Sequence, residues 1–215
     1  MEFLADWKDL MLLPAILAWL ALGRRQPAWV HWAGAQVCLA IVFELFGKFT
    51  SACNVSNHWA YNIYMFLEFG MLSMILFHMP FAPRYIRGQL LFCALLFITV
   101  FLWDSYVHHS FFEFSTNALI VGGLLLAAQA FLALLRISTR GESAPLGRGD
   151  VWALLSIMLY FLCFVPSFGL YNYLTGLSEE RANDLLTIND VLFILRYGLV
   201  SLGFLLVHRT DKAAP

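Results

Sequence analysis

Seven long apolar stretches run through this sequence of 215 residues, and they constrain its fold more than any other feature. Each stretch approaches the ~20 residues that an α-helix needs to cross the ~30 Å hydrocarbon core of a bilayer. They are Leu10–Gly23, Ala28–Phe49, Ala60–Met79, Gly88–Val107, Glu113–Arg136, Val151–Tyr171 and Leu186–His208. Because they are continuously apolar and do not alternate, helices are favoured over barrel strands. The sequence therefore predicts an all-α polytopic membrane protein with a bundle of seven transmembrane helices.

The composition points the same way. Hydrophobic residues make up 61% of the chain and charged residues 13%, and the mean hydropathy is +0.74. A soluble domain has about 45–50% apolar and about 25% charged residues, so the surplus apolar surface is expected to face lipid. The net charge of −1 argues against a nucleic-acid partner. We expect a multi-pass protein of the cell membrane, such as a bacterial inner membrane or its equivalent.

The orientation follows from the basic residues between the stretches. Nine of the 13 Lys and Arg residues lie in the loops on one side, three lie on the other side, and Arg196 lies inside the last stretch. Loops rich in Lys and Arg stay in the cytoplasm. The N-terminus is therefore predicted outside and the C-terminus in the cytoplasm.

The domain organisation is predicted to be simple, with residues 1–215 forming one transmembrane domain. The longest predicted cytoplasmic loop, Ile137–Asp150, is rich in Gly, Ser and Pro and is typical of a flexible connector. No loop is long enough to fold as a soluble output module. Any signal would therefore have to pass through a separate cytoplasmic or membrane partner.

Short internal matches suggest a parallel 3+1+3 repeat with halves 1–79 and 113–208, linked by a helix at 88–107. Ala18–Arg24 matches Ala130–Arg136, and Glu68–Ser73 matches Arg196–Ser201. Chance similarity between segments rich in Leu, Ala and Phe explains these matches equally well.

Polar side chains within the stretches provide the main functional indication. An intramembrane charge costs about 2.5–3.5 kcal/mol at a helix centre and usually faces an interior cavity. At ~1.5 Å per residue, Glu68 and Arg196 lie ~12 Å and ~15 Å below the outer starts of their helices. We predict that they form an ion pair, or that Glu68, Glu44 and Asp190 surround Arg196, at the floor of a pocket open to the outside.

The predicted ligand-binding residues all lie in the outer half or near the midplane. They are Glu44, Tyr61, Asn62, Glu68, Asn117, Ser167, Asn189, Asp190, Arg196 and Tyr197. The alternative is that this polar network only holds the helices together, as interhelical polar contacts often do.

Three functions are compatible with this pattern. The first is a transporter that binds a small polar or zwitterionic ligand in an outward-open cavity. The second is a receptor or sensor that acts through a separate partner. The third, an intramembrane lipid-modifying enzyme, lacks a nucleophile elbow, an HExxH motif or a Cys/His metal cluster, so no catalytic residue, metal or cofactor is predicted. The predicted partners are the lipid bilayer and a small-molecule ligand.

Overall fold

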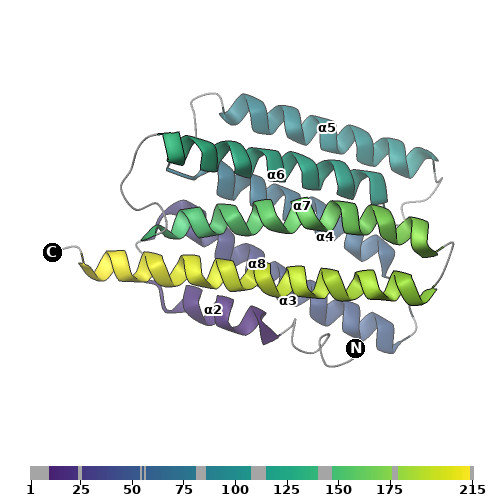
Figure 1. The fold of residues 1–215 in the computed structure, drawn as a ribbon, viewed down its shortest axis with the longest axis horizontal. Helices are drawn as coiled ribbons and strands as arrows, with labels where there is room; N and C mark the ends of the chain where they lie inside the picture. The colour runs from purple at the N-terminus through teal and green to yellow at the C-terminus, as the bar shows by residue number, and fades with distance from the viewer. Residues whose placement is uncertain are drawn as a thin grey trace.

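The structure, a computed structural model, describes residues 10–23, 26–53, 55, 57–80, 86–107, 115–139, 147–175 and 179–213, and its side chains except those of 168–186 and 209–213. Within these residues the regular elements are seven α-helices (Figure 1). They are α2 (Leu12–Leu20), α3 (Ala28–Ala52), α4 (His58–Phe77), α5 (Ile86–Val107), α6 (Thr116–Thr139), α7 (Gly149–Thr175) and α8 (Glu179–Ala213). The prediction of an all-α fold is confirmed.

Six of these helices contain a segment long and apolar enough to cross a membrane. The segments are Ala28–Ala52, His58–Phe77, Ile86–Val107, Thr116–Thr139, Gly149–Ser167 and Thr187–His208. They agree with the last six stretches predicted from the sequence, although the predicted start at Glu113 lies outside the described residues. The first stretch is described as α2, whose nine residues rise only about 14 Å. The crossing by this stretch, the orientation of the termini and the 3+1+3 repeat therefore stay predictions.

The helix boundaries follow local sequence. Helix α3 begins directly after Pro27. Proline suits a helix start because its ring fixes φ and because it has no backbone N–H that would need a partner. Pro166, by contrast, lies inside α7, and the helix continues to Thr175. Proline is tolerated within membrane helices because neighbouring groups can satisfy the freed carbonyl.

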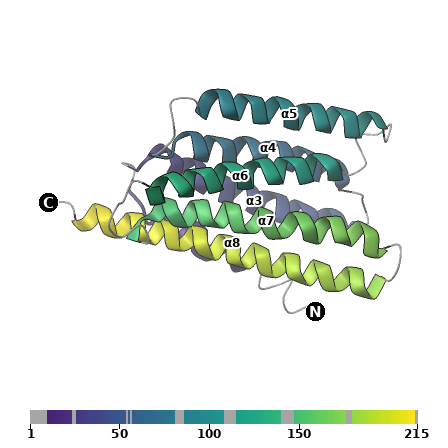
Figure 2. The ribbon, with the colours of Figure 1, turned by 45° about the horizontal axis from the view of Figure 1, so that its top comes forward.

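Helices α2, α3, α4, α6, α7 and α8 pack in a ring, in which α3 lies on α4, α4 on α6, α6 on α7, α7 on α8, and α2 between α8 and α3. Helix α5 packs on the ring from outside, mainly against α6. Figures 1 and 2 show α7 and α8 side by side, with α5 at an edge of the bundle. In this hairpin Gly149 of α7 lies close to Gly203 of α8, and a Cβ added to Gly149 would meet the Gly203 carbonyl oxygen.

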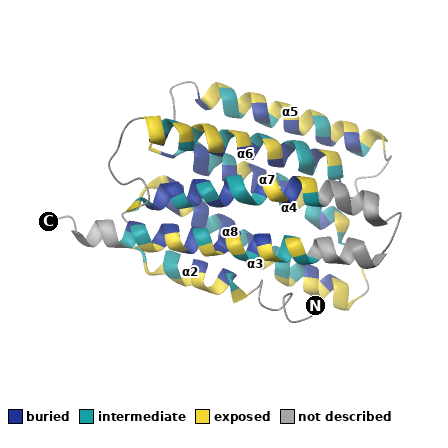
Figure 3. Cartoon of the chain, in the orientation of Figure 1, coloured by how far each residue is buried: buried dark blue, intermediate teal, exposed yellow. Residues whose placement is uncertain are grey.

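Burial divides the helices into an inner and an outer face (Figure 3). Phe97, Leu154, Tyr197 and Phe204 are at most 1% exposed and lie in the common core. Large apolar side chains cover the outside, including Phe92 and Trp103 of α5, each 65% exposed. Contiguous apolar surface of this kind is rare on soluble monomers and suits contact with lipid.

Candidate functional site

A buried ion pair lies at the centre of the bundle. The Nη1 atom of Arg196 on α8 is 2.7 Å from Oε1 of Glu68 on α4, and the two side chains are 2% and 9% exposed. Glu68 lies ten residues after the start of α4, about 15 Å along its axis. That depth is about half of a ~30 Å hydrocarbon core. The ion pair predicted from the sequence is present in the structure.

Two further polar groups contact the carboxylate. Gln36 of α3 donates through Nε2 to Glu68 Oε1 at 3.2 Å and to the Tyr197 hydroxyl oxygen at 3.0 Å. The Tyr64 hydroxyl donates to the same Oε1 at 3.0 Å, one turn away on α4. Side chains from α3, α4 and α8 therefore converge on one carboxylate oxygen.

Aromatic rings enclose the guanidinium group. The Arg196 Cζ atom lies 4.6 Å from the ring centroid of Tyr160, 5.5 Å from that of Phe161 and 5.4 Å from that of Tyr197. The negative faces of aromatic rings attract a cation, and the attraction grows when water is excluded. Arg196 Nη2 is nevertheless buried without a hydrogen-bond partner in the described part of the chain. The site therefore holds a cation that still has one unused donor.

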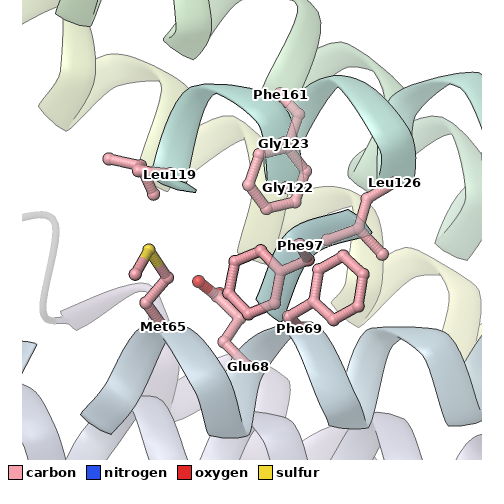
Figure 4. Close-up of a pocket in the computed structure, with 9 residues that line it drawn as sticks. All are labelled: Met65, Glu68, Phe69, Phe97, Leu119, Gly122, Gly123, Leu126 and Phe161. Carbon is pink, nitrogen blue, oxygen red and sulfur yellow. The ribbon is translucent and has the colours of Figure 1, made fainter. Parts of the chain in front are cut away.

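Two small cavities flank the ion pair. The first has a volume of about 10 Å³ and lies beside Glu68, where Met65, Phe97, Leu119 and Phe161 complete much of its wall (Figure 4). The second, also about 10 Å³, is lined by Arg196, Gln36 and Ser156 among apolar residues. A volume of this order accommodates about one water molecule. In this conformation the ion pair is closely enclosed.

Asn62 and Asn117 lie in a different polar cluster, at the start of α6. The Asn62 side-chain oxygen accepts a hydrogen bond from the Ser115 backbone N–H at 3.1 Å. Asp104 of α5 accepts from the Asn117 backbone N–H at 3.1 Å and from its side-chain amide at 2.7 Å. Both acceptors satisfy N–H groups that a helix start leaves unpaired. Asn62 and Asp104 therefore supply acceptors at the start of α6, and Asn117 binds Asp104 there.

The remaining predicted residues lie outside the immediate contacts of the ion pair. Ser167 donates to the Cys163 carbonyl of its own helix at 2.8 Å. Four others are half-buried on α3, α4 and α8, namely Glu44, Tyr61, Asn189 and Asp190. On α4 and α8, Tyr61 and Asn189 are each two turns, about 10 Å, from Glu68 and Arg196 respectively. Both lie toward the α3–α4 turn, on the side predicted to be outside.

Sequence reasoning missed three residues of these clusters. Gln36 and Tyr160 contact the ion pair, and Asp104 caps α6. Gln36 is an isolated amide in an apolar stretch, and Asp104 is an acid near the end of another, so each carried a detectable signal. Tyr160 carried none, because a tyrosine in a membrane helix has many ordinary roles.

Comparison with protein-family models, with curated proteins and with solved structures finds no match for this chain. Among the described residues, no group of three or more His, Cys, Asp or Glu side chains could hold a metal ion. The fold and site thus define a class, an all-helical bundle with six helices suited to a membrane and a buried ion pair at its centre.

Proposed function

We propose that this protein is a multi-pass membrane transporter that binds a small polar or zwitterionic ligand between Arg196 and Glu68. The observation that carries the proposal is the buried ion pair with the unused Nη2 donor of Arg196. In the proposed orientation the N-terminus is outside, the C-terminus is cytoplasmic and the ligand approaches from the α3–α4 turn.

The charge balance of the site favours a ligand with a carboxylate. In a poorly polarisable interior, an arginine that loses its partner carries a penalty of several kcal/mol. A ligand carboxylate can replace Glu68 at Arg196 and can use Nη2 as a second donor, since Arg binds carboxylates through two nitrogens. Glu68 then needs its own compensation, which either the ammonium group of a zwitterion or a bound proton supplies.

The helix contacts suggest how the site would open. Helix α4 packs on α3, α5 and α6, whereas α8 packs on α7 and α2. In the described residues α4 and α8 are not a closely packed pair, so the long side chains of Glu68 and Arg196 connect these two helices across the centre. Ligand exchange at this ion pair would let α4 and α8 move apart, as alternating access requires.

Uptake by proteoliposomes tests this function. The purified protein would be reconstituted and supplied with radiolabelled amino acids and short carboxylates. We expect accumulation of at least one of them, loss of it in Arg196→Gln, and normal uptake in Thr99→Val, a control at an exposed side chain bonded to its own helix. Arg196→Gln must elute as a folded monodisperse protein for its loss to count. Absence of uptake across the panel would contradict transport.

A second function, a ligand-operated sensor, is favoured by the close contact between Gly149 and Gly203. This contact lies at the end of α7 that is proposed to be cytoplasmic, and close backbone packing there leaves little room for a ligand to leave. A ligand at 100 times its Kd would stabilise the protein by about 2.7 kcal/mol. Ligands that raise the unfolding temperature without being taken up would favour the sensor.

A further inference from the structure

The two oxygens of Glu68 have different surroundings. Oε1 receives the contacts from Arg196, Gln36 and Tyr64. Oε2 has no hydrogen-bond or ion-pair partner within the described residues. Glu68 lines a small cavity, and Oε2 is not one of the fully buried atoms. The carboxylate therefore has protein donors on one oxygen and none from the described residues on the other.

The cavity beside Glu68 offers little to compensate Oε2. Its other walls come from Met65, Phe69 and Phe97, from Leu119, Leu126 and two glycines of α6, and from Phe161 (Figure 4). Gly122 and Gly123 allow this enclosure, because a Cβ on either would lie 2.9 Å from a ring carbon of Phe97 or Phe161. The space is suited to one transient water molecule, the smallest carrier of a proton.

Arg196, the cation of the pair, also has a polar atom without a partner among the described residues. Arg196 Nη2 is a donor without an acceptor in the described part of the chain, and Arg196 lines the second cavity together with Gln36 and Ser156. Oε2 can therefore accept a proton, and Nη2 can donate a hydrogen bond to an anionic oxygen. One proton and one carboxylate together would satisfy both atoms and leave the net charge of the cluster unchanged.

We propose that Glu68 is a proton-binding site and that the proton arrives at Oε2 from the cavity beside it. In this step an O–H bond forms at Oε2, the proton comes from a hydronium ion, and a water molecule is left. Glu68 becomes neutral while Arg196 keeps its charge, so the protonated site attracts a carboxylate. This inference rests on the proposed transport function, which it deepens by naming the proton as the coupling ion.

The groups that face Glu68 can be named for each neighbouring helix. Arg196 is the only charged group in direct contact with it among the described residues. The other titratable groups near the pair are the phenols of Tyr64, Tyr160 and Tyr197, and the carboxylate of Glu44 on α3, whose charge acts on Tyr160. Gln36 of α3 contributes a neutral amide. Helices α5 and α6 present only apolar residues and glycines to the cavity. Among the described residues that line the cavity, Glu68 is therefore the one carboxyl that can exchange this proton.

Infrared difference spectroscopy on the full chain in lipid tests the proposal without knowledge of the ligand. Lowering the pH from about 9 to about 4, a range that brackets most shifted carboxyl groups, should produce the carbonyl band of a protonated buried carboxylic acid. The band should shift in D₂O. Glu68→Gln should remove it, whereas Asp150→Asn, at a carboxyl paired with Arg148 at the start of α7, should leave it unchanged.

Because Glu68→Gln leaves Arg196 without its partner and could fail to fold, Glu68→Asp provides a second variant. It keeps a carboxyl group, so the band should change position and not disappear. A band that persists unaltered in both Glu68 variants, or no band in the parent protein, would overturn the proposal. The uptake assay is separate: a Glu68 band without uptake rejects transport alone, and uptake without the band rejects the proton site alone.

Discussion

Arg196 and Glu68 meet through one atom each, Nη1 and Oε1 at 2.7 Å, while Nη2 and Oε2 have no hydrogen-bond partner among the described residues. The pair is thus strongly bound on one side and incomplete on the other. This arrangement is costly for a contact that only stabilises a fold, since apolar packing would serve as well. It is consistent with a site that exchanges partners.

Replacing one member of the ion pair should be far more damaging than replacing both. Glu68→Met and Arg196→Met should each lower the free energy of unfolding by about 3–5 kcal/mol, because each leaves a buried charge unpaired. The double variant should lie near the parent or above it, because no charge remains. Denaturant unfolding in mixed micelles measures all four proteins. Additive losses in the double variant would show that the two residues do not interact.

Because Gly149 lies against Gly203, replacing Gly149 should destabilise the fold much more than replacing Gly198. In Gly149→Ala the new Cβ would meet the Gly203 carbonyl oxygen, a backbone atom that cannot turn away, so α7 and α8 must separate. We expect a loss of about 1–3 kcal/mol, as for overpacked cores. Gly198 of α8 is the matched control, because a Cβ there meets nothing within 4 Å. Gly198→Ala should be neutral or stabilise by up to about 1 kcal/mol. Equal unfolding temperatures for the two variants would refute the close crossing.

Asp104 should stabilise the start of α6. Asp104→Ala removes the acceptor of two Asn117 donors and should cost about 1–3 kcal/mol. Hydrogen exchange should accelerate first in the opening turn of α6. Asp104→Asn keeps one oxygen acceptor and should lose less. Thr99→Val, on the same helix but exposed, should stay within about 0.5 kcal/mol of the parent. Unchanged exchange in Asp104→Ala would mean that the cap contributes little.

Cysteine labelling tests the proposed orientation of the chain in the membrane. Cys53 is exposed at the end of α3, on the side proposed to be outside. A membrane-impermeant maleimide should label it in intact cells, and Cys53→Ser should remove that signal. Ser138 is exposed near the opposite end of the bundle, at the end of α6. Ser138→Cys in the Cys53→Ser background should be labelled only after permeabilisation. The reverse pattern would invert the topology.

The helical architecture could be predicted from the sequence because it depends on the summed hydrophobicity of each stretch. A run of about 20 apolar residues must satisfy its own backbone in lipid, and a helix does so without any neighbour. For this reason the six apolar segments within the long helices agree with the predicted stretches to within a few residues. The Glu68–Arg196 pair could also be predicted, since two opposite charges at similar depth have few other partners.

The partners of the other polar residues depended on how each helix is rotated and which helices are neighbours. Asn62 and Asn117 have the depth expected of ligand-binding residues, yet they lie at the start of α6 beside Asp104. Gln36 contacts both Glu68 and Tyr197 because α3 turns that face inward. Depth along a helix can be counted from the sequence, whereas rotation about its axis is set by the packing of all side chains together. The apolar segments and the ion pair could therefore be predicted from the sequence, whereas the polar contacts around the pair depend on packing between helices.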